Sequence, residues 1–310
     1  MWYCIICLII TMINIVFMGS GNFALNILKS LMFDPNINVL AVVTQPDKPM
    51  GRKKLMTPTP VGSYLHDIEF DSVFKCSKSS EILDAVDFTS SQLSVVVDYG
   101  VLLKEELLET SEFGTINIHP SPLPKYRGAS PLQETLKNGD KKTAVAIQKM
   151  VLKMDAGPIY DMIDYDLSDD DDIESLSSKL SSLAALRLPA LISEIVSGLK
   201  PIEQVGEVSF CNKISKEDGN LDLNKMTAKE CFNFFRAFKI WPKVFVTIDG
   251  KVLKLIDFEV SEIDLKPYEF KKIQSEVYLG TRSGSLKLFN VQPESKAMMP
   301  ALSFYNGYLS

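Results

Sequence analysis

Apolar residues in the first two thirds of the chain occur as short runs that alternate with segments of helical periodicity. The runs are rich in Val and Ile, have the length of buried strands, and cover residues 13–18, 37–45, 91–100, 113–119 and 143–150. Between the first two runs, helical spacing is seen at Phe23, Ile27, Leu28 and Leu31. Strands that alternate with helices predict an α/β fold with a Rossmann-like, mainly parallel sheet that is covered on both faces.

The pattern changes toward the carboxyl end of the chain. Residues 177–195 predict a long helix that packs on the sheet, and the acidic run Asp169–Asp172 suits its first turn, where the helix dipole favours negative charge. From about residue 212, only residues 228–238 keep a helical period. The remainder consists of short apolar runs with turns, including an Asp249-Gly250 hairpin signal. This part predicts a small OB-like β-barrel domain.

These patterns divide the 310-residue chain. We expect an α/β domain at residues 12–199, a linker at 200–211 and the β domain at 212–310. Residues 1–11 form an extension or a misannotated start, because Met12 offers an alternative first residue. The segment 1–19 is nearly long and apolar enough to span a membrane. It lacks a basic amino-terminal region and a cleavage site, and its second half fits a buried strand, so we expect no membrane partner.

Net charge and cysteine content limit the possible partners. The formal net charge is −6, with −8 in residues 1–199 and +2 from Lys200 onward. A polyanionic partner would therefore have to meet local basic clusters rather than a basic face of the whole protein. The five cysteines are scattered, and the C-x-x-C pair of Cys4 and Cys7 has no second pair to complete a metal site. We expect reduced thiols and no metal.

The stretch GSGNFA at residues 19–24 satisfies the G-x-G-x-x-A pattern of dinucleotide-binding turns. Such a site also needs an acidic residue at the end of the second strand, where it binds a ribose hydroxyl. That end reads Val43-Thr44-Gln45 and contains no acid. A nicotinamide or flavin site and a simple tight turn with close helix packing are both open, and the missing acid favours the turn.

A cluster of positive charge lies on a loop of this otherwise acidic domain. Residues 45–62 contain Lys48, Arg52, Lys53 and Lys54 among prolines. In most proteins such a run is only solvated. Here it leaves the carboxyl end of a predicted strand, the edge at which parallel sheets bind their ligands. The alternative is therefore that the four cations bind phosphates, with salt-sensitive affinity.

Three polar residues at predicted strand ends indicate a catalytic site. His119 is one of only two histidines, and Asn117 lies two residues before it, so both side chains point to the same side of an extended strand. Together they offer amide donors and an imidazole that can donate or take a proton near neutral pH. Asp155 ends a further apolar run, from which its carboxylate can reach a histidine on a neighbouring strand. Core packing and turn formation are the alternatives for these residues.

Taken together, these motifs resemble the folate-dependent formyltransferases. Residues 116–133, INIHPSPLPKYRGASPLQ, are similar to that superfamily's Asn-x-His-x-Ser-x-Leu-Pro-x-x-Arg-Gly segment. The stretch MDAGPI at 154–159 is similar to its Asp-x-Gly segment. Residues 42–61 and 213–242 are similar to the basic insertion loop and the start of the C-terminal domain in the branch that acts on methionyl-tRNA. The resemblance covers the chain from Met12 nearly to its end.

The resemblance implies transfer of the formyl group of 10-formyltetrahydrofolate to the α-amine of methionine on initiator tRNA, without a metal. It implies a catalytic domain at residues 12–199, with Asn117, His119 and Asp155 as catalytic residues, and a tRNA-binding domain at 212–310. It further implies a folate pocket that involves Tyr99, Gly100, Ser121, Pro122, Leu123 and Pro124. The residues that it assigns to tRNA are Lys48, Arg52, Lys53 and Lys54.

Some positions depart from the family pattern. Ser20-Gly21 stands where Thr-Pro is usual, Asp98 replaces a small residue and Leu103 replaces a proline. A formyltransferase acting on a sugar nucleotide or another small amine would share the three catalytic residues without needing the basic loop. A non-catalytic nucleic-acid-binding module would not need those residues at all. Against these alternatives, we expect a monomeric enzyme of the bacterial cytoplasm rather than of an organelle matrix.

Overall fold

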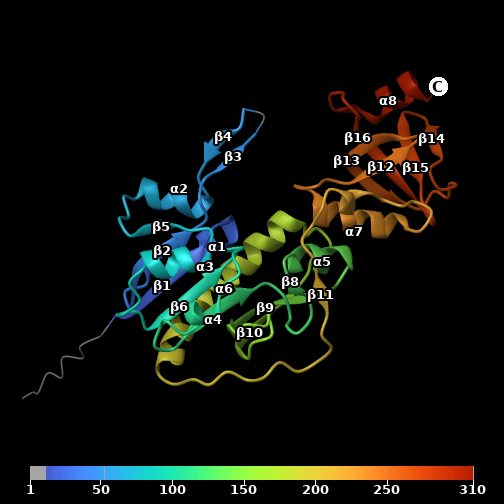
Figure 1. Ribbon diagram of the computed structural model, residues 1–310. Helices are drawn as coiled ribbons and strands as arrows, with labels where there is room; N and C mark the ends of the chain where they lie inside the picture. Colours follow the sequence, from blue (N-terminus) through green and yellow to red (C-terminus); the bar gives the residue numbers. More distant parts are fainter. Residues whose placement is uncertain (1–11, 52, 310) are drawn as a thin grey trace, which may run out of the picture. The chain divides into compact units, whose positions relative to one another are not determined.

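The structure is a computed structural model that describes residues 12–51 and 53–309 (Figure 1). The chain forms two compact units. Unit 1 contains the described residues up to Gly128, together with Thr143–Tyr165 and Ser177–Phe210. Unit 2 contains Ala129–Lys142, Asp166–Leu176 and the described residues from Cys211 onward. The expected extension at residues 1–11 lies outside the described residues.

Unit 1 is built on a seven-stranded sheet with the order β10-β9-β7-β6-β1-β2-β5. The strands are β1 (Ile13–Gly19), β2 (Ile37–Thr44), β5 (Val73–Lys75), β6 (Leu93–Val97), β7 (Thr115–His119), β9 (Lys142–Lys149) and β10 (Ile159–Asp166). Every pairing from β7 through β6, β1 and β2 to β5 is parallel. The predicted mainly parallel α/β sheet is therefore confirmed.

Helices cover both faces of this sheet because its strands are apolar on both sides. The helices are α1 (Asn22–Phe33), α2 (Pro60–Asp67), α3 (Ser79–Ala85), α4 (Glu105–Leu108) and most of α6 (Ile173–Val196). Val16 and Met18 of β1 pack with residues of α3 and α4, so the alternation of the strand turns Phe17 to the other face. There α1 lies beside α6, and Ser30 Oγ donates to the carbonyl of Ala185 at 2.6 Å.

One strand of this sheet runs against the others. β9 is antiparallel to β7, with Asn117 opposite Gln148 and His119 opposite Ala146. The carboxyl end of β9 therefore lies at the edge of the sheet where β7 begins. This reversal matters for the site, because it decides how the chain beyond β9 can reach His119.

The basic segment expected as a long loop forms a two-stranded hairpin instead. β3 (Lys48–Met50) pairs antiparallel with β4 (Leu55–Thr57). In Figure 1 this hairpin extends away from the sheet of unit 1. Its strands are almost entirely exposed. No apolar alternation marks them in the sequence, because neither strand buries a face.

Unit 2 contains the predicted small β domain. Its antiparallel sheet has the order β12-β13-β16-β15-β14, and β17 pairs with β16. The strands are β12 (Phe245–Ile248), β13 (Lys251–Ser261), β14 (Phe270–Ile273), β15 (Glu276–Gly280), β16 (Ser285–Pro293) and β17 (Met299–Pro300). The Asp249-Gly250 turn joins β12 to β13, with Ile248 opposite Lys251, so the predicted hairpin is confirmed.

The remaining elements include the predicted helix at 228–238. They are α5 (Pro131–Lys137), the 3₁₀ helix η1 (Glu217–Gly219), α7 (Ala228–Phe238), α8 (Ala301–Tyr308) and the short strands β8 (Arg127–Gly128) and β11 (Phe210–Cys211). The acidic run expected in the first turn of a helix precedes α6, where Asp172 Oδ1 accepts from the backbone N–H of Ser175 at 3.0 Å. Arg236 of α7 donates to the carbonyls of Asp169 and Asp171. Within residues 12–51 and 53–309, no helix has the length and apolarity to cross a membrane.

Candidate active site

Two side chains of β7 begin the candidate active site. Asn117 and His119 lie two residues apart at the carboxyl end of this strand, so they project from the same face of the sheet. His119 is only 5% exposed. The Asn117 carboxamide donates through Nδ2 to the carbonyl of Val96 on β6, at 3.1 Å. This hydrogen bond fixes the carboxamide across the neighbouring strand.

The His119 ring has a defined environment at each of its nitrogens. Nε2 lies 2.9 Å from the carbonyl oxygen of Tyr126, and because a carbonyl only accepts, Nε2 carries a proton. Nδ1 lies 3.7 Å from Oδ1 of Asp155. This distance exceeds a direct hydrogen bond, and one water molecule or substrate atom can bridge it. The imidazole and the carboxylate can therefore exchange a proton with a group that reacts between them.

Asp155 reaches this histidine from a loop rather than from the end of a strand. β9 ends at Lys149, and Asp155 lies in the following turn with a φ of +48°. The expectation that it ends an apolar strand is wrong, because the antiparallel β9 ends at the opposite edge of the sheet and the chain has to turn back. Gly157 permits the turn, since a Cβ there would lie 1.7 Å from the carbonyl oxygen of Lys149.

Each oxygen of the Asp155 carboxylate accepts a hydrogen bond. Oδ2 accepts from the backbone N–H of Gly128 at 2.8 Å, and Oδ1 accepts from Nε2 of Gln148 at 3.0 Å. The same Gln148 nitrogen lies 3.4 Å from Oδ1 of Asn117. Gln148 was not among the residues predicted from the sequence. The available signal was a polar residue inside the apolar run 143–150, because a buried amide requires hydrogen-bond partners.

The residues that follow β6 combine a buried side chain with an exposed turn. Tyr99 is 2% exposed, and its hydroxyl donates to the carbonyl of Cys76 at 2.8 Å. Its side chain therefore belongs to the core of unit 1. Gly100 is exposed and has a φ of +73°, a conformation that favours glycine. A ligand could contact this turn mainly through its backbone.

The proline-rich segment after β7 is largely buried. Ser121 is fully buried and donates through Oγ to the carbonyl of Lys125 at 2.7 Å. Leu123 and Pro124 are buried as well, while Pro122 is half-buried. These side chains shape the loop that follows His119.

The described lysines of the basic hairpin lie in solvent. Lys48, Lys53 and Lys54 are exposed, and Lys48 Nζ donates to Oε1 of Gln45. Arg52 lies outside the described residues. An exposed cluster of this kind is compatible both with simple solvation and with phosphate binding.

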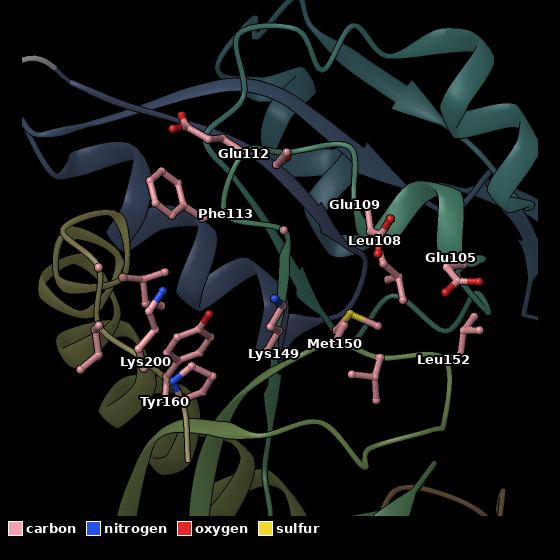
Figure 2. Close-up of a pocket in the computed structure, with 17 residues that line it drawn as sticks. Glu105, Leu108, Glu109, Glu112, Phe113, Lys149, Met150, Leu152, Tyr160 and Lys200 are labelled. Carbon is pink, nitrogen blue, oxygen red and sulfur yellow. The ribbon is translucent and has the colours of Figure 1, made fainter. Parts of the chain in front are cut away.

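A separate pocket of about 600 Å³ opens at the amino end of β7 (Figure 2). Its lining residues come from α4 and the segment after it, from the end of β9 and from the end of α6. They include Glu105, Glu112, Phe113, Lys149, Tyr160 and Lys200. Burial raises the pKa of Tyr160. Neither His119 nor Asp155 is among the lining residues, so this pocket is distinct from the candidate active site.

The described part of the chain offers no group of three or more His, Cys, Asp or Glu residues that could hold a metal ion. Cys76, Cys211 and Cys231 are buried thiols. Cys4 and Cys7 lie outside the described residues.

Both parts of the chain match one protein family. Residues 12–192 match the formyl transferase family, and residues 213–309 match the formyl transferase C-terminal domain. The chain therefore belongs to the formyl transferase family, and it is an enzyme of formyl transfer.

Within this family, the chain is similar to the following proteins of known name or structure. The methionyl-tRNA formyltransferase of Caldicellulosiruptor saccharolyticus is 35% identical over 307 residues, which cover 95% of this chain and 97% of that protein. An N-formyltransferase from Helicobacter canadensis, solved in complex with folinic acid and dTDP-3-aminofucose, has a TM-score of 0.63 at 17% identity and covers 91% of this chain and 100% of its own. The methionyl-tRNA formyltransferase from Clostridium thermocellum has a TM-score of 0.54 at 15% identity, with coverage of 89% and 99%. These two structures share the fold with this chain.

Proposed function

We propose that this enzyme transfers the formyl group of 10-formyltetrahydrofolate to the α-amine of methionyl-initiator tRNA, giving formylmethionyl-tRNA for translation initiation. The observation that carries the proposal is the 3.7 Å approach of His119 Nδ1 to Asp155 Oδ1 beside Asn117, in a chain of this family. The near-complete coverage of the relative from Caldicellulosiruptor saccharolyticus supports the choice of acceptor.

The catalytic roles follow from the chemistry of the reaction. The donor supplies a formyl carbon, and attack by an amine places negative charge on its oxygen. A carboxamide has two N–H donors, and the carbonyl of Val96 uses one of them. We assign the other N–H of Asn117 to stabilisation of that oxygen. His119 joins it through Nδ1 when that nitrogen is protonated as well, because both nitrogens of an imidazolium donate. Asp155 then accepts the proton that the amine loses, directly or through water. The bond between the formyl carbon and the folate nitrogen breaks as this proton is passed to the departing nitrogen. A free α-amine titrates at roughly 7.7–8.0, so modest help with deprotonation is sufficient.

The loops around these groups suit a flat aromatic donor. Leu102 in the loop after β6 is 75% exposed, and Met154, which precedes Asp155, is 58% exposed. Small-molecule pockets are lined mainly by apolar side chains around a few polar groups. We propose that these residues, with the turns at Tyr99-Gly100 and Ser121–Pro124, would hold the folate.

The basic hairpin and the second family region are assigned to the tRNA. Lys48, Lys53 and Lys54 are exposed on the hairpin, and Arg52 lies beside them in sequence. Cations of this density bind phosphate backbones. We propose that residues 12–199 carry catalysis, that 200–211 link the domains, and that 212–310 bind tRNA. The proposed setting is the bacterial cytoplasm, with the enzyme acting as a monomer.

A second candidate is formyl transfer to a sugar nucleotide. It is favoured by the fold shared with the Helicobacter canadensis enzyme, whose structure contains dTDP-3-aminofucose. This alternative leaves the basic hairpin without a role.

A direct assay separates the two candidates. The purified chain is incubated with 10-formyltetrahydrofolate and either methionyl-initiator tRNA or a dTDP-amino sugar, and the formylated product is identified by mass spectrometry. We expect formylmethionine after hydrolysis of the tRNA ester. Formylation of the sugar alone would overturn the proposed acceptor, and formylation of neither would overturn the proposed reaction.

A further inference from the structure

The segment between the two family regions contributes a side chain to the candidate active site. The family matches end at residue 192 and resume at residue 213, so Gln204 lies in neither. Its Oε1 accepts from Nη2 of Arg127 at 2.6 Å and from Nε at 3.2 Å. Arg127 is only 7% exposed, and a buried guanidinium requires such acceptors.

The other end of the same amide contacts the turn that carries the catalytic carboxylate. Nε2 of Gln204 lies 2.9 Å from the carbonyl oxygen of Asp155 and 2.7 Å from that of Gly157. A glutamine amide can donate to both carbonyls while its oxygen accepts from Arg127. One side chain therefore joins the loop after β7 to the loop after β9.

Two further contacts attach this segment on either side of Gln204. The backbones of Ile202 and Ile159 exchange two hydrogen bonds, of 2.7 and 2.8 Å. On the other side, Ser209 accepts from the N–H of Tyr126 through Oγ and from the N–H of Arg127 through its carbonyl, both at 2.9 Å. The carbonyl of Tyr126 is the partner of His119. The segment thus supports the surroundings of both catalytic groups.

The Asp155 turn needs support because of its conformation. Its φ of +48° is unfavourable for a residue with a Cβ, and such a conformation persists only when the surroundings determine it. Residues Lys153 and Met154 of the turn are exposed, so packing contributes little there. The hydrogen bonds from Gln204 supply a restraint at the backbone of the residue that must face His119.

We propose that Gln204 is a positioning residue for formyl transfer. It fixes the Asp155 turn against the Arg127 loop, and it makes turnover depend on the conformation of the segment between the two family regions. The proposal rests on the proposed roles of His119 and Asp155.

The test compares Gln204→Met, which keeps the size of the side chain and removes its polar atoms, with Glu203→Met, an exposed neighbour in the same segment. Gln204→Met is expected to lower kcat by about 10- to 100-fold, because small misplacements of reacting groups have effects of this size. The KM for each substrate should remain close to that of the wild type. The unfolding temperature should fall, because Arg127 loses an acceptor, so kcat is measured well below the unfolding transition. Wild-type kcat in Gln204→Met would overturn the proposal.

Gln204→Glu separates positioning from simple pairing with Arg127. The carboxylate keeps an acceptor for the guanidinium but turns an oxygen toward the carbonyls of Asp155 and Gly157. Positioning predicts a loss of kcat as large as that of Gln204→Met. Recovery of wild-type kcat in Gln204→Glu would show that only the arginine matters and would overturn the proposal.

A double-mutant cycle with Asp155→Asn tests whether Gln204 acts through Asp155. In that background Gln204→Met should change kcat by less than about twofold, because residues that act as a unit are non-additive. Fully additive losses would overturn the proposal.

The activity of the wild type in the same assays tests the proposed function separately. If it formylates only the sugar nucleotide, the same comparison is made with that acceptor. If it formylates neither, hydrogen exchange of residues 150–158 decides: faster exchange in Gln204→Met than in Glu203→Met supports the restraint, and equal exchange overturns it.

Discussion

Gln148 Nε2 lies 3.0 Å from Oδ1 of Asp155 and thereby links the loop beyond β9 back to the strand that precedes it. The same nitrogen lies 3.4 Å from Oδ1 of Asn117. Gln148 is 1% exposed, so its amide cannot form hydrogen bonds with bulk water instead. One buried amide therefore sets the spacing between two of the three groups assigned to catalysis.

Gln148→Met should lower kcat by about 10- to 100-fold, because Asp155 loses a donor that orients its carboxylate. The volume of the side chain is retained, so the fold should survive. The measurement is steady-state formylation of methionyl-tRNA, with the thermal unfolding temperature as the control. A variant with wild-type kcat and KM would remove Gln148 from the site.

Asn117→Ala and His119→Ala should each lower kcat by about 100- to 1,000-fold, because each removes a donor to the developing oxyanion. Asp155→Ala should also lower kcat strongly, since it removes the proton acceptor. Circular dichroism and the unfolding temperature check that each variant folds. Near-wild-type turnover in any of the three would exclude that residue from the mechanism.

The triple variant Arg52→Ala, Lys53→Ala and Lys54→Ala should raise the KM for methionyl-tRNA and leave kcat nearly unchanged. Each lost phosphate contact should reduce the slope of log affinity against log salt by about 0.7–0.9. Binding is measured over a series of salt concentrations. Lys78→Ala, an exposed lysine elsewhere in unit 1, should leave the slope as in the wild type. An unchanged slope in the triple variant would mean that the hairpin cations are only solvated.

Asp98→Asn should make the protein more stable near neutral pH. The Asp98 carboxylate lies against the turn before α1, where a Cβ at Gly21 would come within 1.9 Å of Oδ2. The residue as a whole is exposed, but partial burial of its carboxylate against this turn raises the pKa of Asp98 to about 6, so we expect a small effect on stability. In the unfolded chain the pKa of this carboxyl is about 3.9. The protonated form of Asp98 therefore makes its full contribution to folded-state stability below about pH 3.9, and this contribution is lost as the pH rises through about 6.

Thermal unfolding of the wild type and Asp98→Asn measures this effect across pH. The variant should unfold at a higher temperature at about pH 7.5, and the difference should disappear at about pH 4. A difference that stays constant over this range would contradict the raised pKa.

Much of the architecture could be predicted because it depends on local patterns. The period of the apolar residues gave the strands β1, β2, β6, β7 and β9, the helix α6 and the helix α7. The predicted mainly parallel sheet and the following β domain are confirmed. The hairpin of β3 and β4 was missed, since both of its faces are exposed and leave no apolar pattern.

Part of the candidate site could also be predicted from local sequence patterns. The two-residue spacing of Asn117 and His119 places both side chains on one face of any extended strand. The Asp-x-Gly motif indicated a turn at Asp155. It did not indicate the path of the chain from β9 to that turn, because the run 143–150 does not itself encode the direction of the strand. Gln204 had no local signal, since its polar character fits any exposed linker.

The sequence by itself determined which side chains this protein has available for formyl transfer and which secondary structures carry them, because burial and backbone period act between near neighbours in the chain. Only the tertiary structure decided that β9 runs antiparallel, that Asp155 returns from a loop to within 3.7 Å of His119, and that Gln148 and Gln204 restrain it. These relationships join residues distant in sequence, and they exist only once the sheet and its loops have packed.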